Sequence, residues 1–137
     1  GGTAFISVKE SDRPAALEVV QQLQRLGFTV QATSGTAAYL RDHGVHAETV
    51  NKVMEGRPHV VDHIKNGQVA LVVNTVRTAA SHADSLSIRR EALNKGLAYY
   101  TTIRGARAAV MGIEAILKKE LTIRSLQEYH GTGSAER

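Results

Sequence analysis

Cysteine is absent from this chain, and aromatic residues are few, with four Tyr, two Phe and no Trp. The lack of cysteine excludes disulfides and thiol catalysis and fits a reducing cytosol, so we expect a cytoplasmic protein. No aromatic run is interleaved with basic residues, which argues against a single-stranded nucleic acid as partner. No apolar stretch approaches about 18 residues, so we expect no membrane-spanning segment and no membrane partner.

The length of the chain indicates how many domains it forms, and its net charge indicates which ligands it suits. A chain of 137 residues forms one domain, and folding at this size buries roughly two-thirds of the unfolded surface. The formal charge of +4 suits small anionic ligands and is too diffuse to favour nucleic acid. The chain starts at Gly1 without an initiator Met or a signal-like segment, so we expect a domain cut from a longer chain.

Short apolar segments alternate with helical patterns along the chain. We predict strands at residues 3–8, 28–32, 45–50, 69–73 and 97–100, the third of them weak. We predict helices at residues 15–26, 36–43, 59–65, 84–94, 105–119 and 125–129. This alternation predicts an α/β fold, a three-layer sandwich with a five-stranded parallel sheet. Residues 1–130 would form this domain, and residues 131–137 a disordered tail.

Helix starts and ends carry specific residues. Pro14 is tolerated in a first helical turn, and Gly27 and Gly44 are placed to end two helices. Asp84 or Ser85 would cap the fourth predicted helix. In the fifth, we expect the inward face to be formed by Val110, Ile113, Ile116 and Leu117.

Polar side chains follow each predicted strand. In chain order they are Lys9 to Arg13, Thr33-Ser34-Gly35-Thr36, Asn51-Lys52, Asn74-Thr75 and Thr101-Thr102. Because the carboxyl ends of parallel strands meet at one edge of a sheet, these groups would gather there. Cations, hydroxyls, carboxamides and helix-start amides together suit a phosphate or a phosphorylated metabolite. The sequence therefore predicts an anion site at this edge.

The segment Ala32 to Thr36 joins the end of a strand to the start of a helix. The first amides of a helix lack intrahelical partners, and the helix dipole is positive there. Gly35 would let the backbone approach a ligand closely. Taken alone, Thr33 or Ser34 more commonly serves as a simple helix cap. Because the other predicted strand ends carry similar polar side chains, we favour the interpretation that this segment binds an oxyanion.

The segment NKVMEGRPH at residues 51–59, followed by Asp62 and IKNG at residues 64–67, resembles a known signature. It is similar to the signature of the C-terminal regulatory domain of bacterial carbamoyl-phosphate synthase large subunits, in the methylglyoxal-synthase-like superfamily. The segments at residues 32–36, 74–75, 88–90 and 100–102 occur in the same order as in that family. The likeness extends from Ser7 to Glu128, essentially the whole chain.

The resemblance implies a domain that binds effectors and performs no chemistry itself. It needs no cofactor, and no metal site is implied. The parent enzyme is a ligase that uses glutamine or ammonia, bicarbonate and ATP, with Mg or Mn and K, to make carbamoyl phosphate for pyrimidine and arginine synthesis. In related bacterial enzymes UMP inhibits, while IMP and ornithine activate. The implied partners are a nucleoside monophosphate, the preceding synthase domains, the small glutaminase subunit and further copies of the chain.

The resemblance also assigns residues to sites. The implied effector site contains Arg13, where a lysine is usual, together with Thr33, Ser34, Gly35, Thr36, Lys52, Asn74 and Thr75. Thr101 matches a position that reaches ornithine at the boundary with the preceding domain, and Thr102 lies beside it. After Thr75 the family often has a second Thr and then Ser-Gly-Arg-Arg, whereas this chain has VRTAA at residues 76–80. One hydroxyl is lost and the arginine is displaced, which leaves the choice between UMP and IMP open.

Methylglyoxal synthase shares this fold and is the alternative function. It eliminates phosphate from a triose phosphate with a carboxylate base, which that family supplies from a Gly-Asp-Gln stretch. Here Gly56 is followed by Arg57 and Pro58, so the base is missing. His82 and Asp84 resemble a His/Asp pair of that enzyme, although surface exposure and helix capping are the commoner roles for such residues.

Two further alternatives do not involve an effector. His59 and His63 have the helical spacing of two metal ligands, with Asp62 beside them, but no third ligand is apparent nearby. Solvated or capping histidines are the commoner outcome. A purely structural module for subunit contact is the other alternative, and it is compatible with effector binding.

Overall fold

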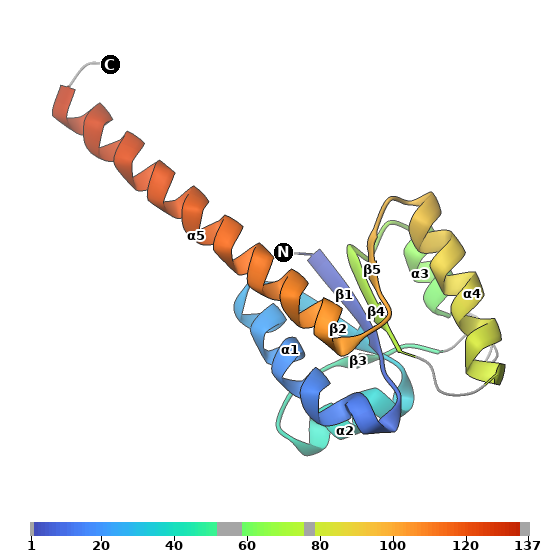
Figure 1. The fold of residues 1–137 in the computed structure, drawn as a ribbon. Helices are drawn as coiled ribbons and strands as arrows, with labels where there is room; N and C mark the ends of the chain where they lie inside the picture. The colour runs from blue at the N-terminus through green and yellow to red at the C-terminus, as the bar shows by residue number, and fades with distance from the viewer. Residues whose placement is uncertain (1, 52–58, 76–78, 135–137) are drawn as a thin grey trace.

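A five-stranded parallel sheet, in the order β3-β2-β1-β4-β5, forms the centre of the computed structural model (Figure 1). Its strands are β1 (Gly2–Ser7), β2 (Phe28–Ala32), β3 (Glu48–Thr49), β4 (Leu71–Asn74) and β5 (Ala98–Tyr100). The structure describes residues 2–51, 59–75 and 79–134, and for 79–84 and 124–134 the backbone alone. The strand order reverses between β1 and β4, the place where such sheets bind ligands.

Helices cover both faces of the sheet. They are α1 (Arg13–Arg25), preceded by the 3-10 helix η1 (Glu10–Asp12), α2 (Ser34–Asp42), α3 (Val60–Lys65), α4 (Ala79–Asn94) and α5 (Ile103–Ser134). Helices α1, α2 and α5 pack on one face, and α3 and α4 pack on the other (Figure 1). The predicted three-layer α/β sandwich is therefore confirmed.

The central strand β1 contributes to both apolar cores. Ala4 and Ile6 are buried in the cluster with α1, α2 and α5, whereas Phe5 is buried in the cluster with α3 and α4. Successive side chains of a strand point to opposite faces, and here both faces are covered. This is why the middle of β1, Ala4 to Ile6, is a continuous apolar run instead of an alternation of apolar and polar residues.

Most element boundaries follow the local signals, with three corrections. Pro14 lies in the first turn of α1, and Gly27, with φ 93°, follows the end of that helix, as predicted. The weak third strand shortens to the two residues of β3. Helix α2 begins at Ser34 and not at Thr36, so Gly35 lies in its first turn. Helix α4 begins at Ala79, which places both Asp84 and Ser85 inside the helix and rules out the predicted N-terminal capping role for either residue.

Helix α5 is much longer than predicted. The separate helix at residues 125–129 is wrong, because α5 continues without a break through residues 131–134. Leu, Lys and Glu are the commonest residues from 117 to 128, and this stretch contains no Gly or Pro that would end a helix. Ile116 was expected to face the core but is 60% exposed. Leu117 is 36% exposed.

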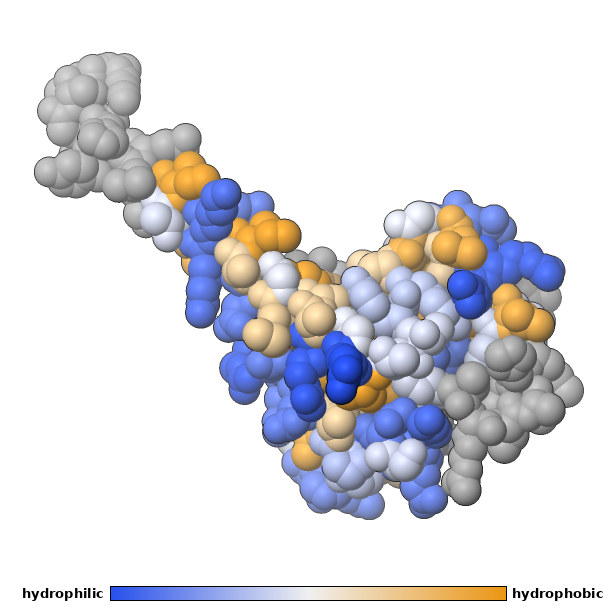
Figure 2. Space-filling view, in the orientation of Figure 1, coloured by the Kyte–Doolittle hydropathy of each residue, from blue (hydrophilic) through white to orange (hydrophobic). Residues whose placement is uncertain are grey.

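The second half of α5 extends beyond the sheet. Figure 1 shows it projecting away from the other elements, and apolar side chains lie along its surface in Figure 2. The buried contacts of α5 come from its first turns, through Ala106 and Val110. Within the described part of the chain, no helix is both long and apolar enough to cross a membrane.

Candidate anion-binding site

The carboxyl ends of β1, β2 and β4 meet at one edge of the sheet. Asn74, the last residue of β4, is the register partner of Ser7, the last residue of β1. On the other side of β1, the Thr33 hydroxyl donates a hydrogen bond to Ser7 Oγ at 3.2 Å. Thr33 and Asn74 therefore flank the same serine. The predicted gathering of these two strand ends at one edge is found in the structure.

Two threonine hydroxyls hold the turn that follows β1. The backbone N–H of Val8 donates to Thr36 Oγ1 at 3.3 Å, and the N–H of Lys9 donates to Thr75 Oγ1 at 2.9 Å. Both threonines are buried, at 2% and 7% exposure. Because they come from α2 and from the end of β4, they fix the turn between two elements. That turn leads through η1 into Arg13.

The start of α2 has no side-chain cap. Thr33 is the N-cap residue, but its side chain makes no capping hydrogen bond, and its hydroxyl contacts Ser7 and Thr36 instead. The first helical bond runs from the N–H of Ala37 to the carbonyl of Thr33 at 2.7 Å. The amides of residues 34–36 therefore lack intrahelical acceptors. The alternative of a simple side-chain cap by Thr33 is therefore wrong. Ser34 and Gly35 are exposed, so this part of the helix start faces solvent, whereas Thr36 is buried.

The guanidinium of Arg13 lies directly over this helix start. Arg13 Nη2 is 2.5 Å from the point that a Cβ on residue 35 would occupy, so only glycine leaves room for it. Arg13 Nε is buried and has no hydrogen-bond acceptor among the described residues. A cation at the positive end of a helix dipole is unfavourable by itself. An anion between Arg13 and the α2 amides would satisfy both groups.

The Asn74 side chain belongs to a buried polar group beside this site. Its Nδ2 donates to Ser85 Oγ at 2.9 Å and to the Tyr99 hydroxyl at 3.1 Å. Ser7, Ser85 and Tyr99 are not among the site residues predicted from the sequence. Ser7 carries the same signal as the predicted residues, a hydroxyl at the end of a strand. Ser85 and Tyr99 carry no such signal, because only the packing of α4 and β5 brings them to Asn74.

The remaining predicted residues are placed as follows. Thr102 accepts a hydrogen bond from the N–H of Gly105 at 3.0 Å and so caps the start of α5. Thr101 is exposed next to it, at the same edge of the sheet. Lys52 lies outside the described residues, as do residues 53–58 and 76–78 and the side chains of His82 and Asp84.

The two histidines of the metal alternative lie at the two ends of α3. The backbone N–H of His59 donates to Asp62 Oδ2 at 2.9 Å, whereas the buried Nδ1 of its ring is 3.6 Å from the same oxygen and has no hydrogen-bond partner among the described residues. His63 Nδ1 is 2.6 Å from Gln68 Oε1. Over the described residues, no group of three His, Asp or Glu side chains is placed to hold a metal ion. These contacts stabilise the start and the end of the short helix α3.

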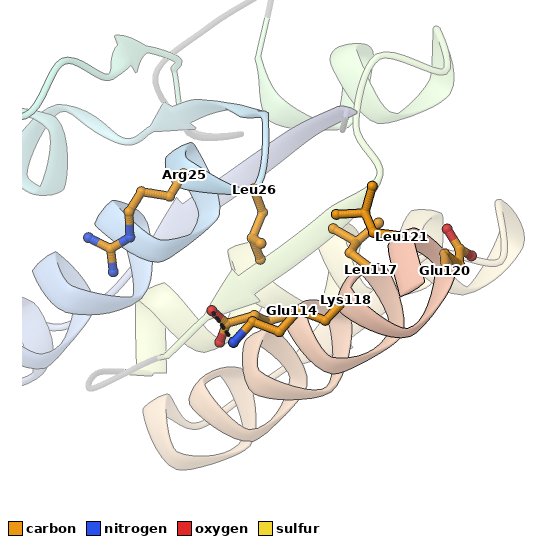
Figure 3. Close-up of a pocket in the computed structure, with 7 residues that line it drawn as sticks. All are labelled: Arg25, Leu26, Glu114, Leu117, Lys118, Glu120 and Leu121. Atoms are coloured by element: carbon orange, nitrogen blue, oxygen red, sulfur yellow. Dashed lines mark ion pairs between the residues drawn. The ribbon is translucent and has the colours of Figure 1, made fainter. Parts of the chain in front are cut away.

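A groove of about 390 Å³ lies elsewhere, between the end of α1 and α5 (Figure 3). It is lined by Arg25, Leu26, Glu114, Leu117, Lys118, Glu120 and Leu121. Leu26 precedes the first residue of β2, whereas Thr33 follows the last one. The groove is therefore at the amino edge of the strands, opposite the candidate anion site.

Comparison with known proteins places the chain in a family. Residues 15–101 match the MGS-like domain family. The carbamoyl phosphate synthase large chain of Myxococcus xanthus (strain DK1622) is 46% identical over 134 residues, which is 98% of this chain and 12% of that protein. The large chain of Xanthomonas campestris pv. campestris is 49% identical over 129 residues, or 94% of this chain and 12% of that protein.

A solved structure agrees with the fold. The crystal structure of ForH superposes with a TM-score of 0.63 over 94% of both chains, at 16% sequence identity. That likeness concerns the fold alone. The chain matches a segment that makes up 12% of each of the two carbamoyl phosphate synthase large chains named above. It belongs to the MGS-like domain family.

Proposed function

We propose that this domain is the allosteric regulatory domain of a carbamoyl phosphate synthase large chain and that it binds the phosphate of a nucleoside monophosphate. The observation that supports this most directly is Arg13, with its buried and unpartnered Nε, over the uncapped start of α2. A phosphate between them accepts hydrogen bonds from the exposed amides and pairs with the guanidinium. UMP and IMP are the effectors that the resemblance suggests.

The charges of the site fit a dianion. The α2 dipole contributes a partial positive charge, worth about 0.3–1 kcal/mol for an anion at an exposed helix start. Arg13 contributes a full positive charge and can bind two phosphate oxygens at once. The buried hydroxyls of Thr33, Thr36 and Thr75 hold the surrounding backbone in place. The hydrogen-bond donors at the start of α2 are therefore already oriented when a phosphate binds.

The proposed regulation acts through the turn after β1. A phosphate that pairs with Arg13 draws the start of α1 toward α2, and the turn moves with it because Val8 and Lys9 are bonded to Thr36 and Thr75. Such a ligand shifts an equilibrium only by its difference in affinity for two states, typically about 1–3 kcal/mol. The receiving elements are the synthase domains of the longer chain, which use ATP and, through the glutaminase subunit, glutamine. Ornithine would act near the exposed Thr101.

Calorimetry tests the proposal. UMP and IMP are titrated into the protein at low salt, with uridine and inosine as matched controls that lack the phosphate. We expect heat with at least one nucleotide, and affinity at least about tenfold lower for the nucleoside, because the phosphate supplies the charge-assisted bonds. Absence of binding for both nucleotides, or equal binding of nucleotide and nucleoside, contradicts the proposal. Formation of methylglyoxal from dihydroxyacetone phosphate contradicts the assignment as a domain without its own catalysis.

A Gly35→Ala substitution is expected to weaken nucleotide binding about tenfold without destabilising the fold. The new Cβ would meet Arg13 Nη2 at 2.5 Å, and the flexible end of that side chain would move away. The lost charge-assisted bond corresponds to about 1.5 kcal/mol. Calorimetry measures the affinity and thermal unfolding the stability. Gly112→Ala is the matched control, because its Cβ would meet no atom within 4 Å, and it should bind as wild type does. Unchanged affinity of Gly35→Ala would contradict this role of Arg13.

A further inference from the structure

We propose that Tyr99 and Ser85 are positioning residues that fix the carboxamide of Asn74 for contact with the bound nucleotide. This inference rests on the proposed function. It adds two residues that have no contact with Arg13 or with the start of α2 in the structure described above. We propose that they act on the ligand through the hydrogen bonds to Asn74, and this makes the inference separately testable.

The geometry leaves the Asn74 side chain little freedom. Asn74 is 4% exposed, and its Nδ2 contacts Ser85 Oγ at 2.9 Å and the Tyr99 hydroxyl at 3.1 Å. A carboxamide nitrogen carries two protons, so two bonds occupy it fully and leave the oxygen for a ligand. The Asn74 carboxamide can be placed with either its nitrogen or its oxygen toward the two hydroxyl groups. Because a hydroxyl both donates and accepts, Ser85 and Tyr99 hold that end of the carboxamide in either orientation. The other end remains to contact a ligand.

The two anchoring residues are themselves held by different elements. Ser85 is buried within α4, and Tyr99 comes from β5, where its ring packs against the apolar cluster beneath α3 and α4. The guanidinium carbon of Arg89 lies 6.0 Å from the centre of the Tyr99 ring. Asn74 is thus positioned by a helix and by the neighbouring strand. Groups held on rigid elements in this way keep a binding geometry within narrow limits.

The location of this polar group argues for a binding role. Asn74 is the register partner of Ser7 and precedes Thr75, which holds the turn toward Arg13. A buried carboxamide that donates to two hydroxyl groups has no packing advantage over apolar residues of similar size. The adjacent Tyr100 shows the contrast, because its ring packs against the opposite cluster, with α1, α2 and α5. It also supplies a matched control in the same strand.

A double-mutant cycle measured by calorimetry with UMP and IMP tests the inference. Tyr99→Phe keeps the ring and removes the hydroxyl, and we expect it to lower the affinity about three- to tenfold, the effect of one hydrogen bond. In an Asn74→Ala background the same substitution should change the affinity by less than about twofold, since its effect passes through Asn74. Ser85→Ala should behave in the same way. Tyr100→Phe should leave the affinity unchanged.

The outcomes separate this inference from the proposed function. If wild type binds neither nucleotide, both fail. If wild type binds a nucleotide but Tyr99→Phe binds it equally well, only the positioning role fails. The same holds if Tyr99→Phe lowers the affinity as much in the Asn74→Ala background as it does in the wild-type background. Thermal unfolding of each variant is measured alongside. If Asn74→Ala does not fold, Tyr99→Phe and Ser85→Ala must each still lower the affinity while Tyr100→Phe does not, and any other pattern overturns the inference.

Discussion

Replacing Arg13 by alanine is expected to weaken the binding of UMP or IMP by about 10- to 100-fold, the equivalent of about 1.5–3 kcal/mol for a hydrogen bond to a charged group. Arg13 lies against the start of α2, with Nη2 over Gly35 and Nε buried without an acceptor among the described residues. Removal of this side chain takes the guanidinium away from the phosphate and leaves, among the described groups over Gly35, the amides at the start of α2. The stability of the fold should change little, because the guanidinium has no partner in the described part of the protein to lose.

Calorimetry of three variants distinguishes this role from a general effect of charge. Arg25→Ala removes an arginine from the other end of α1, beside the groove at the opposite edge of the sheet, and should bind as wild type does at moderate salt. Arg13→Lys keeps the charge but loses the fork of donors, so an intermediate affinity is expected. Equal losses for Arg13→Ala and Arg25→Ala would show long-range attraction only and would contradict a phosphate seat at Gly35.

Phe5→Ala is expected to lower the free energy of unfolding by about 3–5 kcal/mol, the usual result for a buried phenylalanine. Phe5 is fully buried in the central strand, and its side chain lies in the cluster with Val60, Ile64 and Ile88. Its removal leaves a cavity between the sheet and the helices α3 and α4. Because domains are stable by about 5–15 kcal/mol, this one change removes a large part of the total.

Urea unfolding followed by circular dichroism measures the effect of Phe5→Ala. Ile116→Ala is the control, since both residues belong to segments that the hydrophobic pattern assigns to the core. Ile116 is 60% exposed on α5, so its replacement should change the stability by no more than about 0.5 kcal/mol. A loss above about 2 kcal/mol for Ile116→Ala would mean that the projecting part of α5 is covered in solution. A similarly small effect of Phe5→Ala would contradict the described core.

The sequence by itself determined the order and type of the elements. The apolar runs in β1 and β4 are continuous because both faces of the sheet are covered. Gly27 and Pro14 lie where local backbone rules place them. The alternation of strands and helices along the chain predicts a parallel sheet covered by helices. The polar strand ends lie at one edge because of that topology, so the sequence is enough to place Thr33 and Asn74 at the same edge of the sheet.

The tertiary structure alone decided which partners these side chains have. Tyr99 and Ser85 reach Asn74 because β5 and α4 pack beside β4, and no local pattern encodes this contact between distant segments. The same holds for Thr33, whose hydroxyl bonds to Ser7 of a neighbouring strand instead of capping its own helix. Hydrophobic periodicity predicts which face of α5 is apolar but not where the sheet beneath it ends. Ile116 is exposed for that reason, since burial depends on a partner surface that only the assembled fold supplies.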